Sequence, residues 1–480
     1  MSTTVAPPQT STELLPFDAD FIHQGEIVTA PERKRRVGAV IPAYQEEDSI
    51  AAVLDGLLSQ TRMPDEIHVV INNCTDDTFY IARQYAGRHR RRYRDLEQES
   101  IVRIHDVGRL EERKVGALNI GFSMVEHCDY MIGVDGDTVL RPDAVERLLE
   151  EAESDPRIGG ISAIYSIDHD EAKGPLESFL LTGQRQQFAS FNLLNLLRGR
   201  NMAVLGGQCS IFSIRALAAV RDQYRQRGPW VSDSEVEDSL LSLQLKRLGF
   251  STKISASARA DVGPMLTLKS LDAQQVKWNY GGIDLMWPGQ RGNTSGQPFH
   301  PNLRLRWWEN WVMLLNVLVR AGFVLLVLAA LSINALVFSP LWLIPPALAI
   351  MLNVRIALTM HDHRARDVLF ALLFLPAELY LWIRMGHFLR AWTQFLSHQE
   401  QDNWAAQAAA EKGRGKNVYL YPLALSLVAL AMMIGVWIAM PINVQVIVLW
   451  LAWPMQMLIT LLLCGTMVKQ LLRRHRGYRV

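Results

Sequence analysis

Two aspartates, Asp135 and Asp137, stand one residue apart directly after an apolar run at 131–134. That run has the length and branching of a buried strand, and the apolar spacing after Pro142 predicts a helix. The two carboxylates therefore lie where a strand ends, the edge at which open α/β sheets bind ligands. Carboxylates this close repel each other, and a divalent cation with phosphate oxygens on its far side would relieve the repulsion. The alternative is an Asp-Gly turn whose acids only favour a helix start.

The segments around this pair alternate between strand and helix patterns. Strands are predicted at 37–43, 66–72, 101–107 and 130–134, and helices begin near Ser49, Asp76 and Glu112. This order predicts a doubly wound, mostly parallel α/β sheet. A second block, 158–282, carries further strands and helices, and no G-x-G-x-x-G stretch argues for a dinucleotide-binding enzyme. The basic run at 88–94 predicts a solvated helix end and loop, or a contact with phosphates or an anionic membrane surface.

The composition divides the chain into two unlike halves. The chain has 480 residues and a formal net charge of +1, which argues against nucleic acid as a partner. All 13 tryptophans lie at Trp230 or later, and past about residue 310 the sequence is mostly apolar. Four scattered cysteines, Cys74, Cys128, Cys209 and Cys464, form no CxxC pair, so we expect a reducing setting with neither disulfides nor a zinc site. Residues 1–36 lack the apolar core of a signal peptide and predict a disordered tail.

The second half is predicted to be a membrane domain over 300–480. Four crossing segments are expected at 317–338, 340–360, 418–440 and 443–468. The apolar stretch 368–395 contains Pro376, Glu378, Arg384, His387 and Arg390, which are costly in lipid, so we place it at the interface or in a re-entrant hairpin. A second interfacial helix is expected at 302–316. Basic loops place both chain ends in the cytosol, as in an integral protein of the plasma (inner) membrane.

Six short motifs of the chain have family counterparts. They are VIPAYQEE, VVINNCTDDT, ERKVGALNIG, the Asp-Gly-Asp stretch, SEVEDSLL and QQVKW. Region 37–283, read as one cytosolic domain, resembles an inverting family 2 glycosyltransferase with a GT-A-like, nucleotide-diphospho-sugar-binding α/β fold. The membrane part is similar in general layout to bacterial polysaccharide synthases, such as the cellulose, hyaluronan and poly-N-acetylglucosamine enzymes.

The resemblance implies a donor site on the first three motifs. Pro42, Tyr44 and Glu46 fall in the family's nucleotide-holding loop, where Tyr44 could pack on the base. Asn72 stands where the family usually has an acid that reads the base edge, and an amide can also donate and accept there. Lys114 and Asn119 match the family's helix residues, and Lys114 would neutralise the diphosphate. The alternative for Lys114 is an ordinary surface lysine.

The resemblance also implies the metal and the base. Asp135 would contact the nucleoside or metal, and Asp137 would bind Mg²⁺ or Mn²⁺, which stabilises the diphosphate as a leaving group. Glu237 and Asp238 match the family's acidic triplet, with Val236 in place of its first residue. We expect Asp238 to be the general base that takes the proton of an acceptor hydroxyl. The alternative is that both acids only stabilise a helix N-terminus.

An acceptor site is implied by QQVKW and by one further stretch, LGGQCSIF at 205–212. QQVKW resembles the Gln-x-x-Arg-Trp motif of processive members, so Gln274 would hold phosphate or sugar and Trp278 would stack on the acceptor sugar. Lys277 stands where the family has arginine, and a lysine ammonium cannot form the two parallel hydrogen bonds that a guanidinium forms. Gly207 and Gln208 fall in the family's acceptor-side loop, where glycine allows close backbone approach.

These expectations lead to one main function and two alternatives. The main one is inverting, metal-dependent transfer of a sugar from a nucleotide diphosphate, taken as UDP, to a growing polysaccharide at the cytosolic membrane face, with possible export. One alternative is transfer to a membrane lipid or polyprenyl-phosphate acceptor. The other is a transporter or scaffold with a dead nucleotide-binding domain, against which the set of Asp135, Asp137, Asp238 and Trp278 argues. The sequence does not fix the sugar, the linkage or the oligomeric state.

Overall fold

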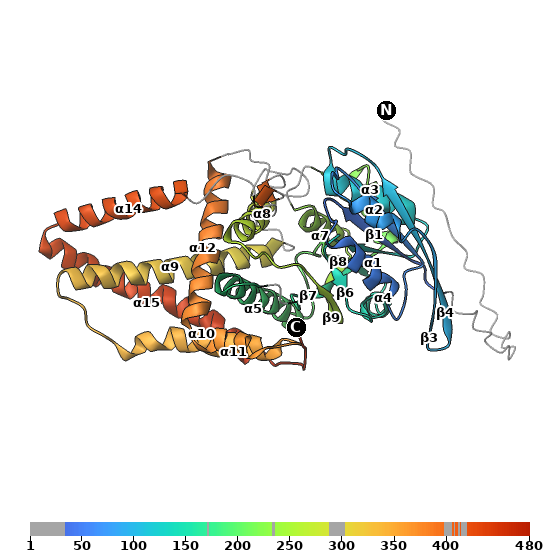
Figure 1. Cartoon of the computed structure of the whole chain (residues 1–480). Helices are drawn as coiled ribbons and strands as arrows, with labels where there is room; N and C mark the ends of the chain where they lie inside the picture. The colour runs from blue at the N-terminus through green and yellow to red at the C-terminus, as the bar shows by residue number, and fades with distance from the viewer. Residues whose placement is uncertain are drawn as a thin grey trace, which may run out of the picture. The chain divides into compact units, whose positions relative to one another are not determined.

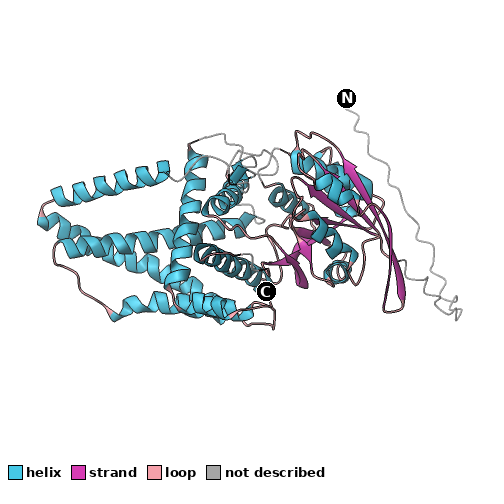
Figure 2. Cartoon of the chain, viewed as in Figure 1, coloured by secondary structure: helices cyan, strands magenta, loops and turns pink. Residues whose placement is uncertain are grey.

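The structure is a computed structural model. It describes residues 34–169, 172–232, 236–287, 303–397 and 420–480, together with 406, 407, 409, 410 and 413. Strands and helices mix up to about residue 286, and the later elements are helices (Figures 1 and 2). The predicted disordered tail lies almost wholly outside the described residues.

One mixed sheet organises the first part. Its strands are β1 (Val37–Ala43), β2 (Glu66–Ile71), β3 (Gly87–Tyr93), β4 (Leu96–Asp106), β5 (Tyr130–Val134), β6 (Val139–Leu140), β7 (Ile158–Ser166), β8 (Cys209–Ser213) and β9 (Ser251–Asp261). Their order is β3-β4-β2-β1-β5-β8-β7-β9-β6, in which β4, β2, β1 and β5 run parallel and β8 runs antiparallel to β5 and β7. The predicted doubly wound, mostly parallel sheet is confirmed in its central strands.

Helices cover both faces of this sheet. They are α1 (Ile50–Leu58), α2 (Thr78–Arg83), α3 (Arg113–Val125), α4 (Ala144–Glu153), α5 (Pro175–Leu197), α6 (Ile214–Tyr224) and α7 (Glu237–Arg247), and α8 (Leu268–Met286) follows them in the sequence. Leu54 of α1 and Leu148 of α4 pack in one buried cluster, whereas Phe122 of α3 and Leu217 of α6 pack in another. Since a strand's side chains alternate between faces, the neighbouring residues Ala39 and Val40 of β1 enter different clusters.

Most of the basic run at 88–94 lies in strand β3, which ends at Tyr93, so the prediction of a helix end and loop is wrong. β3 pairs antiparallel with β4 in a hairpin. Arg88 and Arg90 both lie beside Glu99 of β4, at 2.7 and 2.9 Å. Cross-strand ion pairs of this kind stabilise a strand whose own side chains have little β propensity. The hairpin carries its charges toward solvent, because Arg88 and Arg90 are more than half exposed.

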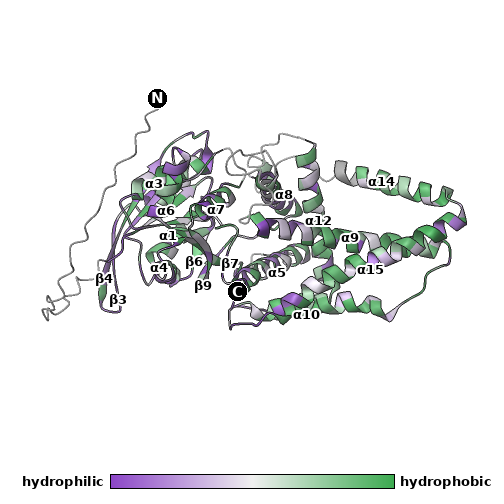
Figure 3. Cartoon of the chain, turned by 180° about the vertical axis from the view of Figure 1, so that it is seen from behind, coloured by the Kyte–Doolittle hydropathy of each residue, from purple (hydrophilic) through white to green (hydrophobic). Residues whose placement is uncertain are grey.

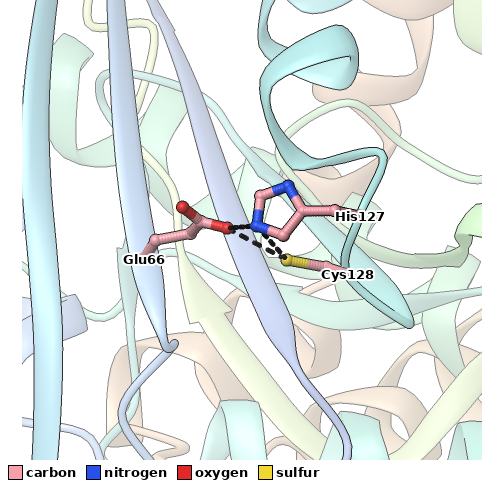
Figure 4. A group of neighbouring side chains, drawn as sticks. All are labelled: Glu66, His127 and Cys128. Carbon is pink, nitrogen blue, oxygen red and sulfur yellow. Dashed lines mark hydrogen bonds and ion pairs between the residues drawn. The ribbon is translucent and has the colours of Figure 1, made fainter.

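A polar cluster lies at the amino-terminal end of β2, away from Asp135, with Glu66 and Cys128 buried and His127 exposed. Glu66, His127 and Cys128 offer ligand-type atoms within 4.8 Å of one another (Figure 4). The Cys128 thiol donates to Glu66 at 3.1 Å, and Arg103 pairs with the same carboxylate at 2.7 Å. Burial alone would raise the pKa of Glu66, but these donors with His68 and His127 outweigh it and lower the pKa to about 2. The carboxylate is thus already neutralised by hydrogen bonds and an arginine.

The later helices are long and apolar. They are α9 (Arg304–Ser332), the short 3₁₀ helix η2 (Pro340–Leu343), α10 (Ile344–Thr359), α11 (Ala365–Leu372), α12 (Leu375–Leu396), α14 (Leu420–Ala439) and α15 (Ile442–Leu472). Figure 3 shows apolar residues gathered on α9, α10, α14 and α15. Among the described residues, three helical segments could cross a membrane by length and composition: Arg304–Ser332, Pro340–Thr359 and Ile442–Leu472. The predicted span 418–440 falls on α14, part of which lies outside the described side chains.

The segment 368–395, predicted to lie at the interface or to form a re-entrant hairpin, falls on two helices. α11 and α12 meet at an 80° bend, a geometry that fits either a broken span or a re-entrant loop. Phe374 has φ 59° at the bend, and Pro376 sits in the first turn of α12, where a proline needs no hydrogen-bond partner. The predicted interfacial helix 302–316 is not separate either, because α9 continues unbroken from Arg304 to Ser332.

The charged residues of α12 pair with other elements. Glu378 pairs with Arg320 of α9, and Arg390 pairs with Asp272 of α8. Tyr380 lies flat over Gly183 of α5, where any Cβ would overlap its ring. In Figure 1, α12 (orange) runs across α9 and α15. Two of the residues that would be costly in lipid, Glu378 and Arg390, therefore attach α12 to α9 and α8, and Tyr380 packs the same helix against α5.

Candidate active site

A cavity of about 820 Å³ lies at the carboxyl ends of β1, β2 and β5. Every residue predicted for the site lines it except Asn119. They are Pro42, Tyr44, Glu46, Asn72, Lys114, Asp135, Asp137, Gly207, Gln208, Glu237, Asp238, Gln274, Lys277 and Trp278. Motifs that are far apart in the sequence thus face one space, and this space continues past them to residues of α9, α12 and α15.

The aspartate pair sits in the turn that follows β5. The Asp135 backbone N–H donates to the Gln208 carbonyl at 3.0 Å, and the Thr138 hydroxyl donates to Asp137 at 3.2 Å. Gly136 between them is required by packing, since a Cβ there would lie 2.7 Å from Cγ of Glu46. The oxygen-only donor set is the kind that Mg²⁺ and Mn²⁺ prefer, and it leaves the remaining ligand positions to a substrate.

Lys114 faces this pair from the first turn of α3. Its ammonium lies 2.6 Å from Oδ1 of Asp135 and 3.9 Å from Oε1 of Glu237. Burial disfavours the charged form, but Asp135, Glu237 and Asp238 outweigh it and raise the pKa of Lys114 above its ordinary value. Lys114 is therefore a permanent cation inside the cavity, and the reading of an ordinary surface lysine is wrong.

Asp238 lies at the start of α7, with its backbone carbonyl bonded by the Ser242 hydroxyl at 2.6 Å. Burial and the neighbouring carboxylate of Glu237 raise its pKa well above the ordinary value, while Lys114 and Lys277 act in the other direction. A carboxyl with a raised pKa holds a proton more readily than a free aspartate does. That property suits a group that must accept a proton from an alcohol.

Gly207 packs against the side chains of both Lys114 and Asp238. A Cβ on this residue would lie 2.5 Å from Oδ2 of Asp238 and 2.9 Å from Nζ of Lys114. Gly206 beside it touches the hydroxyl of Tyr165, which donates to the Gly206 carbonyl at 3.0 Å. The two glycines thus let the loop before β8 run directly under the charged groups.

The end of the cavity predicted to bind the donor is formed by the loops after β1 and β2. Tyr44 is half exposed at its rim, and Glu46 accepts a bond from the Ser49 hydroxyl at 2.7 Å. Asn72 is buried, and its amide nitrogen donates to the Ala43 carbonyl at 3.3 Å. Its Oδ1 atom is buried without a hydrogen-bond partner. An unpaired oxygen at this position can accept a hydrogen bond from an N–H group on the edge of a nucleotide base.

Asn119 does not line the cavity. Its amide donates to the Trp230 carbonyl at 2.9 Å and accepts from the Trp230 N–H at 3.1 Å. Gly228 packs directly on the same side chain. Asn119 therefore fixes the segment that leads into α7, so its part in the site is to hold that segment in place.

The end of the cavity predicted to bind the acceptor is built from α5 and α8. Trp278 lies edge-on to Phe188, with 6.5 Å between ring centroids. The Gln187 amide donates to Gln275 at 2.9 Å and accepts from the Tyr380 hydroxyl of α12 at 2.9 Å. These hydrogen bonds link this wall of the cavity to α12.

Several lining residues could not be expected from the motifs. Tyr165, Gln187 and Arg113 line the catalytic part, and Arg198, Arg306 and Glu309 line the part beside α9. Only Arg113, which adjoins Lys114 in the ERKVG motif, carries a sequence signal. Tyr165 stands on strand β7, and the others stand on α9 or on α5 and its C-terminal end, where the apolar pattern gives no sign of a functional face.

Residues 39–221 match the family described as Glycosyl transferase family 2. The chain carries a family 2 glycosyltransferase domain. Its sheet and helices form the GT-A-like fold of a nucleotide-sugar transferase, as predicted, followed by apolar helices. The protein is therefore a glycosyltransferase.

Curated relatives are poly-beta-1,6-N-acetyl-D-glucosamine synthases. One from Staphylococcus epidermidis is 20% identical over 320 residues, covering 66% of this chain and 68% of that relative. One from Staphylococcus aureus strain MSSA476 is 23% identical over 250 residues, covering 52% of this chain and 54% of that relative. The chain thus spans about half the length of the second relative.

Similar solved structures include two metal complexes. Mannosyltransferase PcManGT from Pyrobaculum calidifontis, with GDP-Man and Mn²⁺, has a TM-score of 0.45 and 17% identity, covering 77% of this chain and 89% of that one. Glucosyl-3-phosphoglycerate synthase from Mycobacterium tuberculosis, with Mn²⁺ and UDP-glucose, has a TM-score of 0.29 and 17% identity, covering 46% of this chain and 68% of that one.

Proposed function

We propose that this glycosyltransferase is an inverting, metal-dependent enzyme that transfers a sugar from a nucleotide diphosphate to a glycan at the membrane. The observation that carries the proposal is the meeting of Lys114 and Asp238 over Gly207, beside Asp135 and Asp137. A cation for a leaving diphosphate and a base for an incoming hydroxyl are the two groups that such a transfer needs.

The donor would lie along the edge of β1, β2 and β5. The buried Oδ1 of Asn72 would accept from the base, which a uracil N–H could supply, so we take UDP as the carrier. Asp135 and Asp137 would hold Mg²⁺ or Mn²⁺, which when bound supplies Lewis-acid stabilisation of the departing diphosphate. Lys114 adds a fixed positive charge to the same oxygens.

Transfer would then be a single displacement at the anomeric carbon. Asp238 accepts the proton of the acceptor hydroxyl as the new C–O bond forms. The bond between the anomeric carbon and the diphosphate oxygen breaks on the opposite side, and its electron pair leaves with the diphosphate. Attack and departure on opposite faces invert the anomeric configuration.

The acceptor would stack on Trp278, with Gln274 and Lys277 beside it. A growing polysaccharide is the first candidate acceptor, because the curated relatives are named as synthases of a polysaccharide. A lipid-linked acceptor is the second candidate, because the cavity continues to residues of α9, α12 and α15. Since nucleotide sugars are cytosolic, the catalytic part and both chain ends would face the cytosol, with the apolar helices in the plasma membrane.

A donor screen tests the proposal. The purified full chain in lipid nanodiscs is given UDP-, GDP- and ADP-sugars with Mg²⁺, Mn²⁺ or EDTA, and products are sized by mass spectrometry. We expect metal-dependent turnover of a UDP-sugar, lost in EDTA, with inverted anomeric configuration in the product. Turnover that survives EDTA, or a retained configuration, would overturn the metal role or the single displacement.

A further inference from the structure

The part of the cavity beside α9 holds a group of cations that the transfer reaction does not use. Arg198 at the end of α5 and Arg306 of α9 both line the cavity. Lys246 of α7 and Arg473 at the end of α15 lie close enough for their charges to act on these two arginines. We call these four residues the basic cluster.

Within the part of the chain that the structure describes, the carboxylate of Glu309 pairs with two members of the basic cluster. Glu309 lies 3.3 Å from Nη1 of Arg306 and 3.9 Å from Nη1 of Arg198. Lys246 bonds an amide oxygen, that of Asn201, at 3.1 Å. Burial, together with the charge of Arg306, lowers the pKa of Lys246 to about 8. Like charges held this close repel one another, and a bound anion would relieve that repulsion.

Unused hydrogen-bond donors point the same way. Nη1 of Arg198, Nε of Arg306 and Nη1 of Arg473 are buried without hydrogen-bond partners. Buried donors of charged groups are rarely left unpaired, because each costs free energy of desolvation. Several guanidinium nitrogens with spare donors match a phosphate group, which offers several acceptor oxygens around one centre.

The walls beyond the cluster indicate that the phosphate belongs to a lipid. Val312 and Met313 of α9 and Leu381 and Phe388 of α12 line the same cavity. Arg306 stands near the start of α9 and Arg473 caps the end of α15, and these two apolar helices are joined by a bond from Gln456 to the Val319 carbonyl. The cluster thus lies where two candidate membrane spans reach the catalytic part. A free phosphate would make no use of the apolar walls.

We propose that the basic cluster binds the phosphate or diphosphate head group of a membrane lipid, whose chain lies along α9 and α12. The inference rests on the proposed function only in taking this cavity as the transferase cavity, and it favours a phosphate-bearing lipid at the acceptor end. Glu309 would then oppose binding, because it would share the arginines with the lipid phosphate.

Lipid titrations of the full chain test the proposal. The protein in neutral detergent is titrated with phosphatidic acid, phosphatidylcholine and inorganic phosphate, and bound lipid is counted by native mass spectrometry. We expect phosphatidic acid to bind at least about tenfold more tightly than phosphatidylcholine, because its terminal phosphate has more negative charge and more free oxygens for the arginines than a choline phosphodiester has. Inorganic phosphate should displace it only at far higher concentrations. Equal binding of the two lipids would overturn the site, and displacement by phosphate at equal concentration would overturn its lipid source.

Variants locate the site. The double variant Arg198→Gln/Arg306→Gln should lose about tenfold or more in affinity for phosphatidic acid. Arg88→Gln/Arg92→Gln, which removes the same charge from the exposed β3–β4 hairpin, should lose nothing. Glu309→Gln should bind more tightly, and this sign test remains if the double variant fails to fold. Unchanged affinity in Arg198→Gln/Arg306→Gln or weaker binding in Glu309→Gln contradicts the proposal.

UDP binding measured on the same samples separates the two hypotheses. Lipid selectivity without UDP binding would contradict the proposed donor while leaving the basic cluster intact. UDP binding without lipid selectivity would contradict only the lipid site.

Discussion

The Asp238 carboxyl lies among both acidic and basic side chains, and its protonation state determines the pH at which it can serve as the base. Burial and Glu237 raise its pKa, so protonated Asp238 persists to higher pH than a free aspartate would. Only the ionised form can take the acceptor proton. Turnover should therefore rise with pH through the raised pKa of this group, and the turnover number measured between pH 5 and pH 8 checks the direction.

Asp238→Asn and Asp137→Asn should fail in different ways. The first removes the base, so turnover should fall by about 10²–10⁴ while UDP and metal still bind. The second removes a metal ligand, so metal-dependent UDP affinity should fall together with turnover. Isothermal titration with UDP and Mn²⁺, beside a turnover assay, separates them. Near-normal transfer by Asp238→Asn would exclude Asp238 as the base.

A single methyl group at position 207 should disturb the site. In Gly207→Ala the new Cβ would lie 2.5 Å from the Asp238 carboxylate, so the base or the loop must move. Misplacement of about 1 Å can cost about 10² in rate, and we expect a loss of that size in turnover. Gly386→Ala is the matched control, because nothing lies within 4 Å of a Cβ there. Equal rates in the two variants would show that Gly207 is not confined by the charges above it.

At the scale of elements, α11 is fixed to α5 by a buried ion pair. Arg185 and Asp367 form two hydrogen bonds, at 3.1 and 3.0 Å, with both side chains almost inaccessible. Breaking a buried pair by removing one partner costs about 3–5 kcal/mol, because the other charge is left uncompensated. Asp367→Asn should therefore lower the Tm strongly, as followed by thermal unfolding in detergent.

The exposed pair of Asp155 and Arg157 supplies the control. Its arginine is 80% exposed, and exposed pairs contribute about 0–1 kcal/mol. Asp155→Asn should hardly change the Tm. If both variants behaved alike, the Arg185–Asp367 pair would not be what holds α11.

The elements also show how far the sequence alone could lead. Asp135, Lys114 and Asp238 could be placed together because each follows or begins a strongly patterned element, and strand order then brings their ends to one edge. Strand β3 could not be predicted from the sequence, because arginines have little β propensity. Its pairing with Glu99 is visible only in three dimensions. Arg198 and Arg306 carry no local signal, because only the packing of α9 against the catalytic part brings them together.

At the scale of the whole molecule, the side of the membrane on which α12 ends is decisive. If α11 and α12 lie along the cytosolic surface, cysteines introduced at His363 and Ser397 should both react with a membrane-impermeant maleimide only from the cytosolic side. The pairing of Glu378 and Arg390 with α9 and α8 supports that arrangement. Labelling is read in inverted and right-side-out vesicles, with the partly exposed Cys74 replaced by serine. Labelling of the two sites from opposite sides would establish a fifth crossing.

The bond between Asp272 and Arg390 has a consequence for the surroundings of the enzyme. α8 carries Trp278 and is tied to α12 by that bond, while α12 is tied to α9 through Glu378. A bilayer that is too thin for the length of α9 would tilt that helix, and a bilayer that is too thick would be thinned around it. The tilt would pass through α12 to α8, which carries the proposed acceptor wall. Acyl-chain length would then regulate sugar addition without any regulator binding, so the same enzyme would work at different rates in membranes of different thickness.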